Sequence, residues 1–146
     1  MKRIFTVLVL IVSLIVSLSA WSRNDDYNSR LVTDTIKEFI NTNYPGARIV
    51  DAEYDDGLLK IEISHQWKEK NVYFSKQDQW QYTKWEVRSF DLPKAVKDAI
   101  KKSEFSRFRI DDVDYIQMSS CDYYRIELER GDYDVKLSIT PDGKIL

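Results

Sequence analysis

The sequence predicts an α+β protein built as a tandem repeat, in which each unit packs one helix on a four-stranded antiparallel sheet. Two observations lead to this prediction. An apolar stripe with helical spacing occurs once in each half of the chain, and each stripe is followed by short segments in which apolar and polar residues alternate, as in half-buried strands. The stripes consist of Val32, Ile36, Phe39 and Ile40 in the first half and of Leu92, Val96, Ala99 and Ile100 in the second.

The similarity between the two halves continues beyond the helices. Residues 51–54 (DAEY) return as residues 112–115 (DVDY), and residues 61–63 (IEI) return as residues 126–128 (IEL). The offset between matching segments grows along the chain, as insertions in loops would make it. We therefore expect two units, residues 31–90 and 91–146. A unit of about 60 residues is only marginally stable alone, which favours packing of the two units on each other.

The first twenty residues have the pattern of a secretory signal peptide. Lys2 and Arg3 precede an apolar run over residues 4–18. Cleavage after Ser19 or after Ser22 fits the pattern, and a retained anchor is the alternative because the run approaches the about 20 residues that span a bilayer. We expect a periplasmic or secreted protein with no stable membrane insertion after cleavage. Residues 21–30 show no periodicity and are expected to form a flexible N-terminus.

The first unit begins with an amphipathic helix over residues 31–43. Tyr44-Pro45-Gly46 ends it, because proline cannot continue a helix and glycine permits the reversal of the chain. Four strands are then predicted, at residues 47–54, 58–67, 72–75 and 80–87. The turns between them are expected at residues 55–57 (DDG), 68–70 (KEK) and 76–79 (KQDQ).

The second unit begins at Asp91-Leu92-Pro93, where the aspartate can cap a helix and proline suits its first turn. This helix is expected to end near Lys102. Strands are predicted at residues 108–118, 123–130 and 134–140, and residues 144–146 start a fourth strand that the chain hardly completes.

The order of these signals resembles a known family. A Tyr44-Pro45-Gly46 turn after the first helix, Leu92-Pro93 at the start of the second and a closing Asp-Gly-Lys turn are similar to the PepSY-like family of β-lactamase-inhibitor-like secreted proteins. The resemblance covers residues 31–146 and implies a tandem repeat of helix-plus-sheet units. It brings no catalytic residues, and the family name reflects structural similarity to an inhibitor. Residues 105–110 (FSRFRI) depart from the Tyr-Pro-Gly pattern in the second unit.

Charge and cysteine content exclude several classes of function. The chain has 22 basic and 24 acidic residues, so its balance favours no nucleic-acid partner. Its one cysteine, Cys121, can form no internal disulfide and lies too far along the chain for a lipid anchor behind the signal. A cysteine nucleophile needs a base, and His65 is the single histidine. We expect no catalytic residues, and we interpret Cys121 as an incidental thiol between strands.

One acidic window has partial calcium-loop spacing. Asp51, Glu53, Asp55 and Glu62 occupy the first, third, fifth and twelfth positions of a loop, but the sixth position, which requires glycine, is Asp56. The flanking residues also predict strands rather than helices. An ordinary acidic hairpin is the favoured interpretation, and His65 is expected on a strand surface. We therefore predict no metal site and no cofactor.

Aromatic residues in the strands of the first unit are the candidate binding group. Strand alternation predicts that Trp80 and Tyr82 share one face with Lys84, while Trp85 lies on the other face with Thr83 and Val87. One interpretation is that one set fills the core and the other pairs across strands. The other is a recognition surface, since Trp and Tyr are common at binding hot spots. The predicted site comprises Trp67, Tyr73, Trp80, Tyr82 and Lys84.

The sequence thus predicts an exported, non-enzymatic binding module. In the preferred hypothesis it inhibits or regulates a protein of the envelope or a secreted protein, and its partner is that protein. In the alternative hypothesis it binds a peptide, a glycan or another small ligand in a groove between the repeats.

Overall fold

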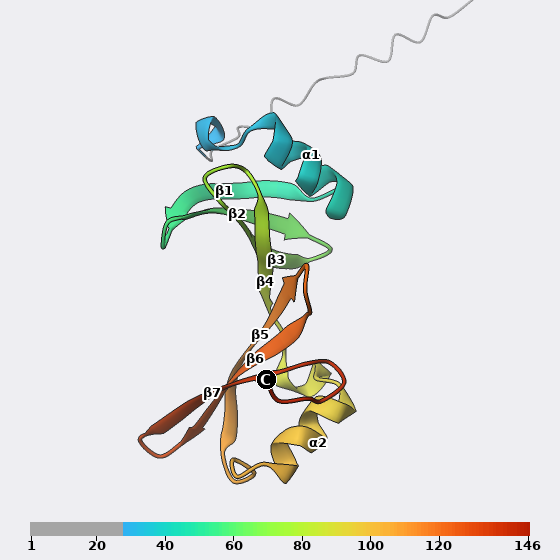
Figure 1. Ribbon diagram of the computed structural model, residues 1–146, viewed down its shortest axis with the longest axis vertical. Coiled ribbons are helices and arrows are strands. Elements are labelled where there is room, and N and C mark those ends of the chain that lie inside the picture. The colour runs from blue at the N-terminus through green and yellow to red at the C-terminus, as the bar shows by residue number, and fades with distance from the viewer. Residues whose placement is uncertain (1–27) are drawn as a thin grey trace, which may run out of the picture.

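A computed structural model describes residues 28–146 of the chain. The predicted signal peptide at residues 1–20 and most of the predicted flexible segment at residues 21–30 lie outside the described residues. No helix within residues 28–146 is both long enough and apolar enough to cross a membrane. The structure contains helices, strands and two short 3-10 helices (Figure 1). In chain order these are η1 (Ser29–Leu31), α1 (Asp34–Asn43), β1 (Arg48–Asp55), β2 (Leu58–His65), β3 (Lys68–Phe74), β4 (Trp80–Glu86), η2 (Ser89–Asp91), α2 (Lys94–Lys102), β5 (Arg109–Met118), β6 (Tyr123–Arg130) and β7 (Tyr133–Ile139).

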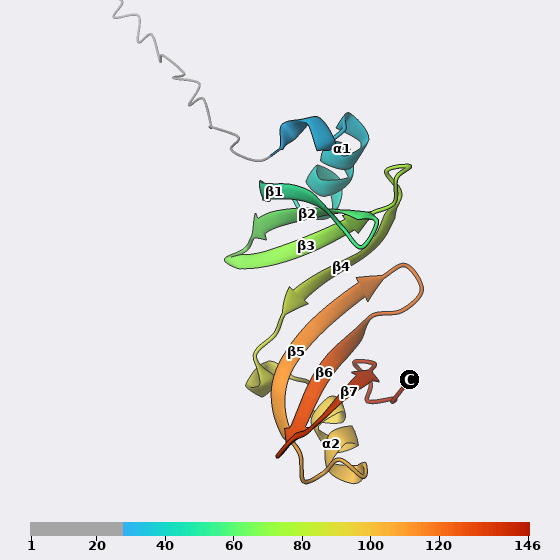
Figure 2. The ribbon, with the colours of Figure 1, turned by 90° about the vertical axis from the view of Figure 1, so that its left-hand side faces the viewer.

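The seven strands form one antiparallel sheet in which each strand pairs with its neighbours along the chain, in the order β1 to β7. The α+β tandem architecture predicted from the sequence is confirmed. Strands β4 and β5 join the two halves, with pairs running from Tyr82 opposite Met118 to Glu86 opposite Asp114. The helices lie at opposite ends of the elongated molecule, and the strands form a continuous ladder between them (Figure 2).

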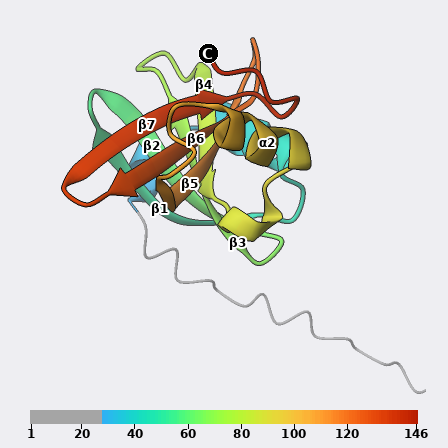
Figure 3. The ribbon, with the colours of Figure 1, turned by 90° about the horizontal axis from the view of Figure 1, so that it is seen from below.

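Both helices pack on the same face of this sheet. Ile61 of β2 pairs with Val72 of β3, Val72 with Thr83 of β4, and Thr83 with Gln117 of β5, so these side chains share one face. Ile61 and Val72 belong to the core under α1. Val113, four residues before Gln117 on the same face of β5, belongs to the core under α2. A view along the long axis shows α1, in cyan, behind α2 and on the same side of the strands (Figure 3).

The first core confirms the helical stripe of the first unit. Ile36 and Ile40 of α1 are fully or almost fully buried against Ile61 and Phe74 of the sheet. The side chain of Thr33 caps the helix by accepting a hydrogen bond from the backbone N–H of Ile36 at 3.3 Å. The helix ends before the predicted Tyr44-Pro45-Gly46 turn, where the glycine adopts a φ of +80°.

The second core is built in the same way, with Val96 and Ile100 of α2 packed on Val113 and Ile126. Its helix start differs from the sequence prediction. Asp91 does not cap α2 but belongs to η2, and its carboxylate accepts a hydrogen bond from the guanidinium of Arg88 at 2.9 Å. The helix begins after Pro93 without a side-chain cap.

The sheet of the second unit is shorter than that of the first. It has three strands, and the predicted fourth strand is reduced to one isolated bridge between Ile139 and Ile145. The turn before this bridge packs closely on α2. A Cβ atom at Gly143, where φ is +91°, would lie 2.7 Å from the carbonyl oxygen of Ala95, so only glycine fits there.

Candidate binding surface

No helix within residues 28–146 covers the sheet face opposite α1 and α2, and we call this face the open face. Cross-strand pairing places its central residues in two rows. One row runs through Lys60, Tyr73, Tyr82 and Met118, and the next through Glu62, Asn71, Lys84, Ile116 and Tyr123. The open face is therefore continuous across the junction between the two units.

Two of the predicted site residues, Tyr73 and Tyr82, form the aromatic centre of the open face. Their rings stack with centroids 4.3 Å apart. Tyr73 is 5% exposed, and its hydroxyl donates a hydrogen bond to Asp55 at 3.3 Å, whereas Tyr82 is half-buried. Burial, followed by the neighbouring Tyr82 and Asp55, raises the pKa of Tyr73 well above its usual range. The buried ring of Tyr73 packs against the ring of Tyr82, which is partly exposed to solvent.

Lys84, another predicted site residue, lies beside this pair on the open face. Its ammonium group is 3.6 Å from the carboxylate of Asp114 on β5. The cross-strand neighbour of Lys84 is Ile116, which is 1% exposed although no helix covers this face. Neighbouring side chains of the open face, rather than a helix, therefore bury Ile116.

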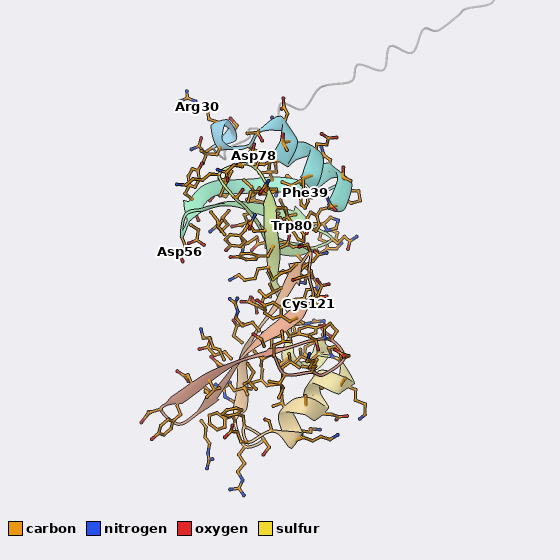
Figure 4. All side chains as sticks on the ribbon, in the orientation of Figure 1. Arg30, Phe39, Asp56, Asp78, Trp80 and Cys121 are labelled. Carbon is orange, nitrogen blue, oxygen red and sulfur yellow. The ribbon has the colours of Figure 1, made fainter. Side chains whose placement is uncertain are left out.

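Trp80 does not lie on the open face, and the prediction that it shares a face with Tyr82 and Lys84 is wrong. A bulge shifts the register between β3 and β4, so that Tyr73 pairs with Tyr82 but Phe74 pairs with Trp80. One extra residue on β4 moves Trp80 to the helix side. There its ring stacks on Phe39 of α1 at 5.5 Å, and Figure 4 shows the two residues together between α1 and the sheet.

Trp67 stands at the tip of the β2–β3 hairpin, with a relative exposure of 104%. The sequence predicts a turn at residues 68–70, but the structure places it at Gln66 and Trp67, and Lys68 already belongs to β3. Both turn residues have positive φ, 52° and 63°, a conformation that two-residue hairpin turns require and that glycine or asparagine adopts most easily. A full indole is thus held in solvent by a strained backbone.

A cavity of about 690 Å³ lies beside Trp67, where the open face meets the connection from β4 to α2. We call it the rim cavity. Arg88 closes one part of it, since its guanidinium pairs with Asp91 at 2.9 Å and lies 4.2 Å from the ring centroid of Phe90. The lining residues are Ser64, Gln66, Trp67, Lys68, Glu69, Glu86, Arg88 and Asp91.

On the helix side, a second aromatic group bridges the two cores. Trp85 lies 4.7 Å from Tyr115, and Tyr115 lies 4.9 Å from Tyr124, measured between ring centroids. The ammonium group of Lys70 is 3.9 Å from the ring centroid of Trp85, and burial together with the nearby Lys68 lowers the pKa of Lys70. The prediction that Trp85 lies opposite Tyr82 is confirmed. The predicted site does not include the tyrosines of the second unit, because their approach to Trp85 depends on the β4–β5 register, which local sequence does not specify.

Three further predictions concern polar residues. The sequence predicts His65 on a strand surface, but the structure buries it to 8% exposure on the helix side, where its ring and that of Tyr44 make a T-shaped contact with centroids 5.7 Å apart. Cys121 is exposed in the connection between β5 and β6, as expected (Figure 4). The acidic window from Asp51 to Glu62 forms the β1–β2 hairpin. Within residues 28–146, no group of three His, Cys, Asp or Glu side chains is arranged to hold a metal ion.

Comparison with protein families shows to which family the chain belongs. The family model described as "Putative beta-lactamase-inhibitor-like, PepSY-like" matches residues 19–68 and, a second time, residues 65–146. The chain belongs to this PepSY-like family. The resemblance inferred from the turn and helix-start signals is therefore confirmed, including the tandem arrangement. Among curated proteins, none matches the sequence significantly.

Solved structures share the PepSY-like fold. A BLIP-like protein from Bacteroides fragilis is 24% identical with a TM-score of 0.70, and the match covers 78% of this chain and 82% of the other. A DUF2874 family protein from Bacteroides uniformis is 20% identical with a TM-score of 0.69, covering 78% and 86%. A protein from Bacteroides eggerthii described as "putative periplasmic" is 20% identical with a TM-score of 0.66, covering 79% and 86%.

Proposed function

We propose that this PepSY-like protein is an exported binding module that holds a protein partner on its open face, with Trp67 at the rim. The observation that carries the proposal is the fully exposed indole of Trp67 on a strained turn beside a helix-free sheet. Apolar groups in such positions mark interaction surfaces, and Trp and Tyr dominate binding hot spots. Tyr82 and Lys84 supply the adjacent contacts, and Tyr73 fixes the position of Tyr82.

The placement of the reactive side chains supports binding rather than catalysis. His65 is buried on the helix side and Cys121 lies in an exposed connection, and within residues 28–146 neither ring nitrogen of His65 forms a hydrogen bond with the thiol. A cysteine nucleophile depends on a base within hydrogen-bond reach. The rim cavity contains carboxylates but neither of these groups.

The comparisons support a role in the envelope. One relative is described as BLIP-like and another as periplasmic. Together with the predicted export signal at residues 1–20, these descriptions favour an inhibitor or regulator of an envelope or secreted protein as the form that binding takes here.

Capture of a partner by the immobilised protein tests the proposal. Envelope extract from the source organism is passed over the wild type, Trp67→Ala and Tyr82→Ala. Each substitution is expected to weaken binding of the same captured protein by about 30-fold, which corresponds to a hot-spot contribution of about 2 kcal/mol. Tyr133→Ala is the matched control, because Tyr133 is 75% exposed at the distant β6–β7 turn. Equal capture by all four proteins would contradict the proposal.

Binding of a small ligand is the second candidate, and the rim cavity favours it. The cavity has the volume of a small-molecule site and lies where the first unit joins the second. A peptide or glycan that binds without any captured protein, and that protects Trp67 from solvent, would support this candidate instead.

A further inference from the structure

We propose that the rim cavity receives a cationic side chain, an arginine or a lysine, from the protein partner. This inference rests on the proposed function and names the chemistry of the partner at one end of the open face. It follows from the cavity, from the free indole at its edge and from the charges left uncompensated on its walls.

The indole of Trp67 is available as one wall of this site. Its exposure of 104% means that no described side chain covers either ring face. The face of an indole attracts a cation, and tryptophan does so more strongly than tyrosine or phenylalanine. The chain already contains such contacts, of Lys70 with Trp85 and of Arg88 with Phe90. Trp67 is an exposed indole at the cavity without such a partner among the described residues.

Two exposed carboxylates, those of Glu69 and Glu86, line the cavity. Glu69 pairs with Ser64 on β2, and continuing the register beyond the pair of Asn71 with Lys84 places Glu69 opposite Glu86. Like charges that face each other across two strands repel, so this arrangement lowers the stability of the free protein. A cation between Glu69 and Glu86 removes that repulsion.

The remaining charges of the cavity leave these carboxylates uncompensated. Arg88 is neutralised by Asp91 at 2.9 Å. Among the residues that the structure describes, neither Glu69 nor Glu86 forms an ion pair or a side-chain hydrogen bond. Lys68 is the one other cation on the lining, so two free carboxylates face a single ammonium group.

The wider open face also suits a basic partner. Acidic residues outnumber basic ones on it, and the salt bridges of Glu53 with Lys60, Asp114 with Lys84 and Glu127 with Lys136 use several of the cations. Charge complementarity of this kind guides association and selects the partner. The cavity opens onto this face, so a side chain projecting from a docked protein reaches it. A free amine would gain none of the contacts along the sheet.

The interaction is tested with blocked amino acids that differ only in charge. Nα-acetyl-arginine amide is titrated into the ¹⁵N-labelled protein while the indole N–H signal of Trp67 is followed by NMR. Nα-acetyl-citrulline amide has nearly the same shape and no charge. We expect saturable shifts with arginine, with a dissociation constant of about millimolar order, and binding of citrulline weaker by about tenfold or more. Raising the salt concentration should weaken the arginine complex.

Charge-removing variants locate the site. Glu69→Gln and Glu86→Gln should each weaken arginine binding about fivefold or more, and Trp67→Ala should lose it along with its own signal, followed then through neighbouring backbone amides. Glu127→Gln is the matched control, since Glu127 lies on the same face but is paired with Lys136 at 3.1 Å. Equal binding of arginine and citrulline, or no effect of either glutamate variant, would overturn the inference. So would a neutral probe, maltohexaose, that binds at Trp67 irrespective of Glu69 and Glu86.

Partner capture by the Tyr82→Ala and Glu86→Gln variants distinguishes a failure of this inference from a failure of the proposed function. If Tyr82→Ala loses the partner and Glu86→Gln retains it at full affinity, the open face binds a protein but the cavity takes no cation from it. The inference is then wrong and the proposed function stands. Loss of the partner in both variants, with Tyr133→Ala unchanged, supports both.

Discussion

The polar side chain of His65 is buried and the apolar side chain of Trp67 is exposed, although the two residues lie only two positions apart on one hairpin. The imidazole of His65 is 8% exposed, and neither ring nitrogen has a hydrogen-bond partner among residues 28–146. A buried polar group without a partner costs free energy, about 1–3 kcal/mol for each lost hydrogen bond. The indole of Trp67 is entirely in solvent. Solvent exposure of the larger apolar group fits a residue that contacts a partner, as proposed for Trp67.

Replacing His65 by leucine tests the status of the buried imidazole. An apolar side chain of similar size removes the unpartnered nitrogens and retains most of the packing against Tyr44, so His65→Leu should leave the free energy of unfolding unchanged or raise it by up to about 1 kcal/mol. Urea denaturation followed by circular dichroism measures the change. His65→Ala is the control and should lower stability, because it leaves a cavity. A clear loss of stability in His65→Leu would show that the ring holds a bonded water or another partner.

At the scale of the element, the β2–β3 hairpin combines a fully exposed tryptophan with two successive non-glycine residues in the left-handed region. Gln66 and Trp67 both have positive φ, which costs a residue other than glycine roughly 1–2 kcal/mol. The adjoining strands are regular, with seven pairs from Leu59 opposite Phe74 to His65 opposite Lys68. A stable ladder therefore holds a strained tip in one conformation, which lowers the entropy that a partner must remove on binding.

An asparagine–glycine turn should separate stability from binding in this hairpin. The double substitution Gln66→Asn with Trp67→Gly introduces the residues that this turn type prefers, so the free energy of unfolding should rise by about 1 kcal/mol. The same protein should lose partner capture as Trp67→Ala does. Thermal and urea denaturation measure the first effect, and a fall in stability would contradict the assignment of strain to this turn.

The helices and most strands were predictable because burial imposes their periodicity. Ile36 and Val96 are fully buried at the predicted positions of their stripes, and alternation along β2 matches its buried face. Alternation fails where a strand carries an extra residue. The bulge beside Phe74 turns Trp80 to the helix side, and no glycine or proline marks it in the sequence.

The structure places the residues of the predicted site on different faces of the sheet. Tyr82 and Lys84 share the open face as the alternation predicts, and Tyr73 pairs with Tyr82 there, whereas Trp80 packs against the first core. The turn at Gln66 and Trp67 was missed because neither residue type signals a left-handed conformation. The rim cavity depends on the approach of Glu86 to Glu69 across two strands, which is a property of register rather than of local sequence.

At the scale of the whole molecule, one sheet makes the two units interdependent. The β4–β5 pairing joins strands β1–β4 of the first unit to strands β5–β7 of the second in one sheet. Tyrosines from both units lie next to this pairing on both faces of the sheet. On the helix side, the hydroxyl of Tyr44 lies 2.7 Å from that of Thr83 and donates to Gln117 at 3.0 Å, which ties the end of α1 to β5. Loss of this central region should expose both cores, so we expect the described part of the chain to unfold as one unit.

These central tyrosines predict loss of stability at high pH. Burial is the main cause that raises the pKa of Tyr44, Tyr73, Tyr82, Tyr115 and Tyr124 in the folded protein. An unfolded tyrosine has a pKa of about 10. Above that pH the folded state retains protons that the unfolded state releases, so the stability present below pH 10 falls as the pH rises towards the raised values.

The measurement combines two signals during an alkaline titration. Tyrosinate absorbance at 295 nm should rise for these residues together with the loss of the circular dichroism signal of the fold, rather than before it. Tyr124→Phe should flatten the decline of stability above about pH 10, since burial alone raises the pKa of Tyr124 and phenylalanine keeps the ring packed on Tyr115 without an ionisable group. Ionisation of all these tyrosines in a fully folded protein would show that the centre of the sheet is open to water, and the coupling of the two units through it would then be weaker than the contacts indicate.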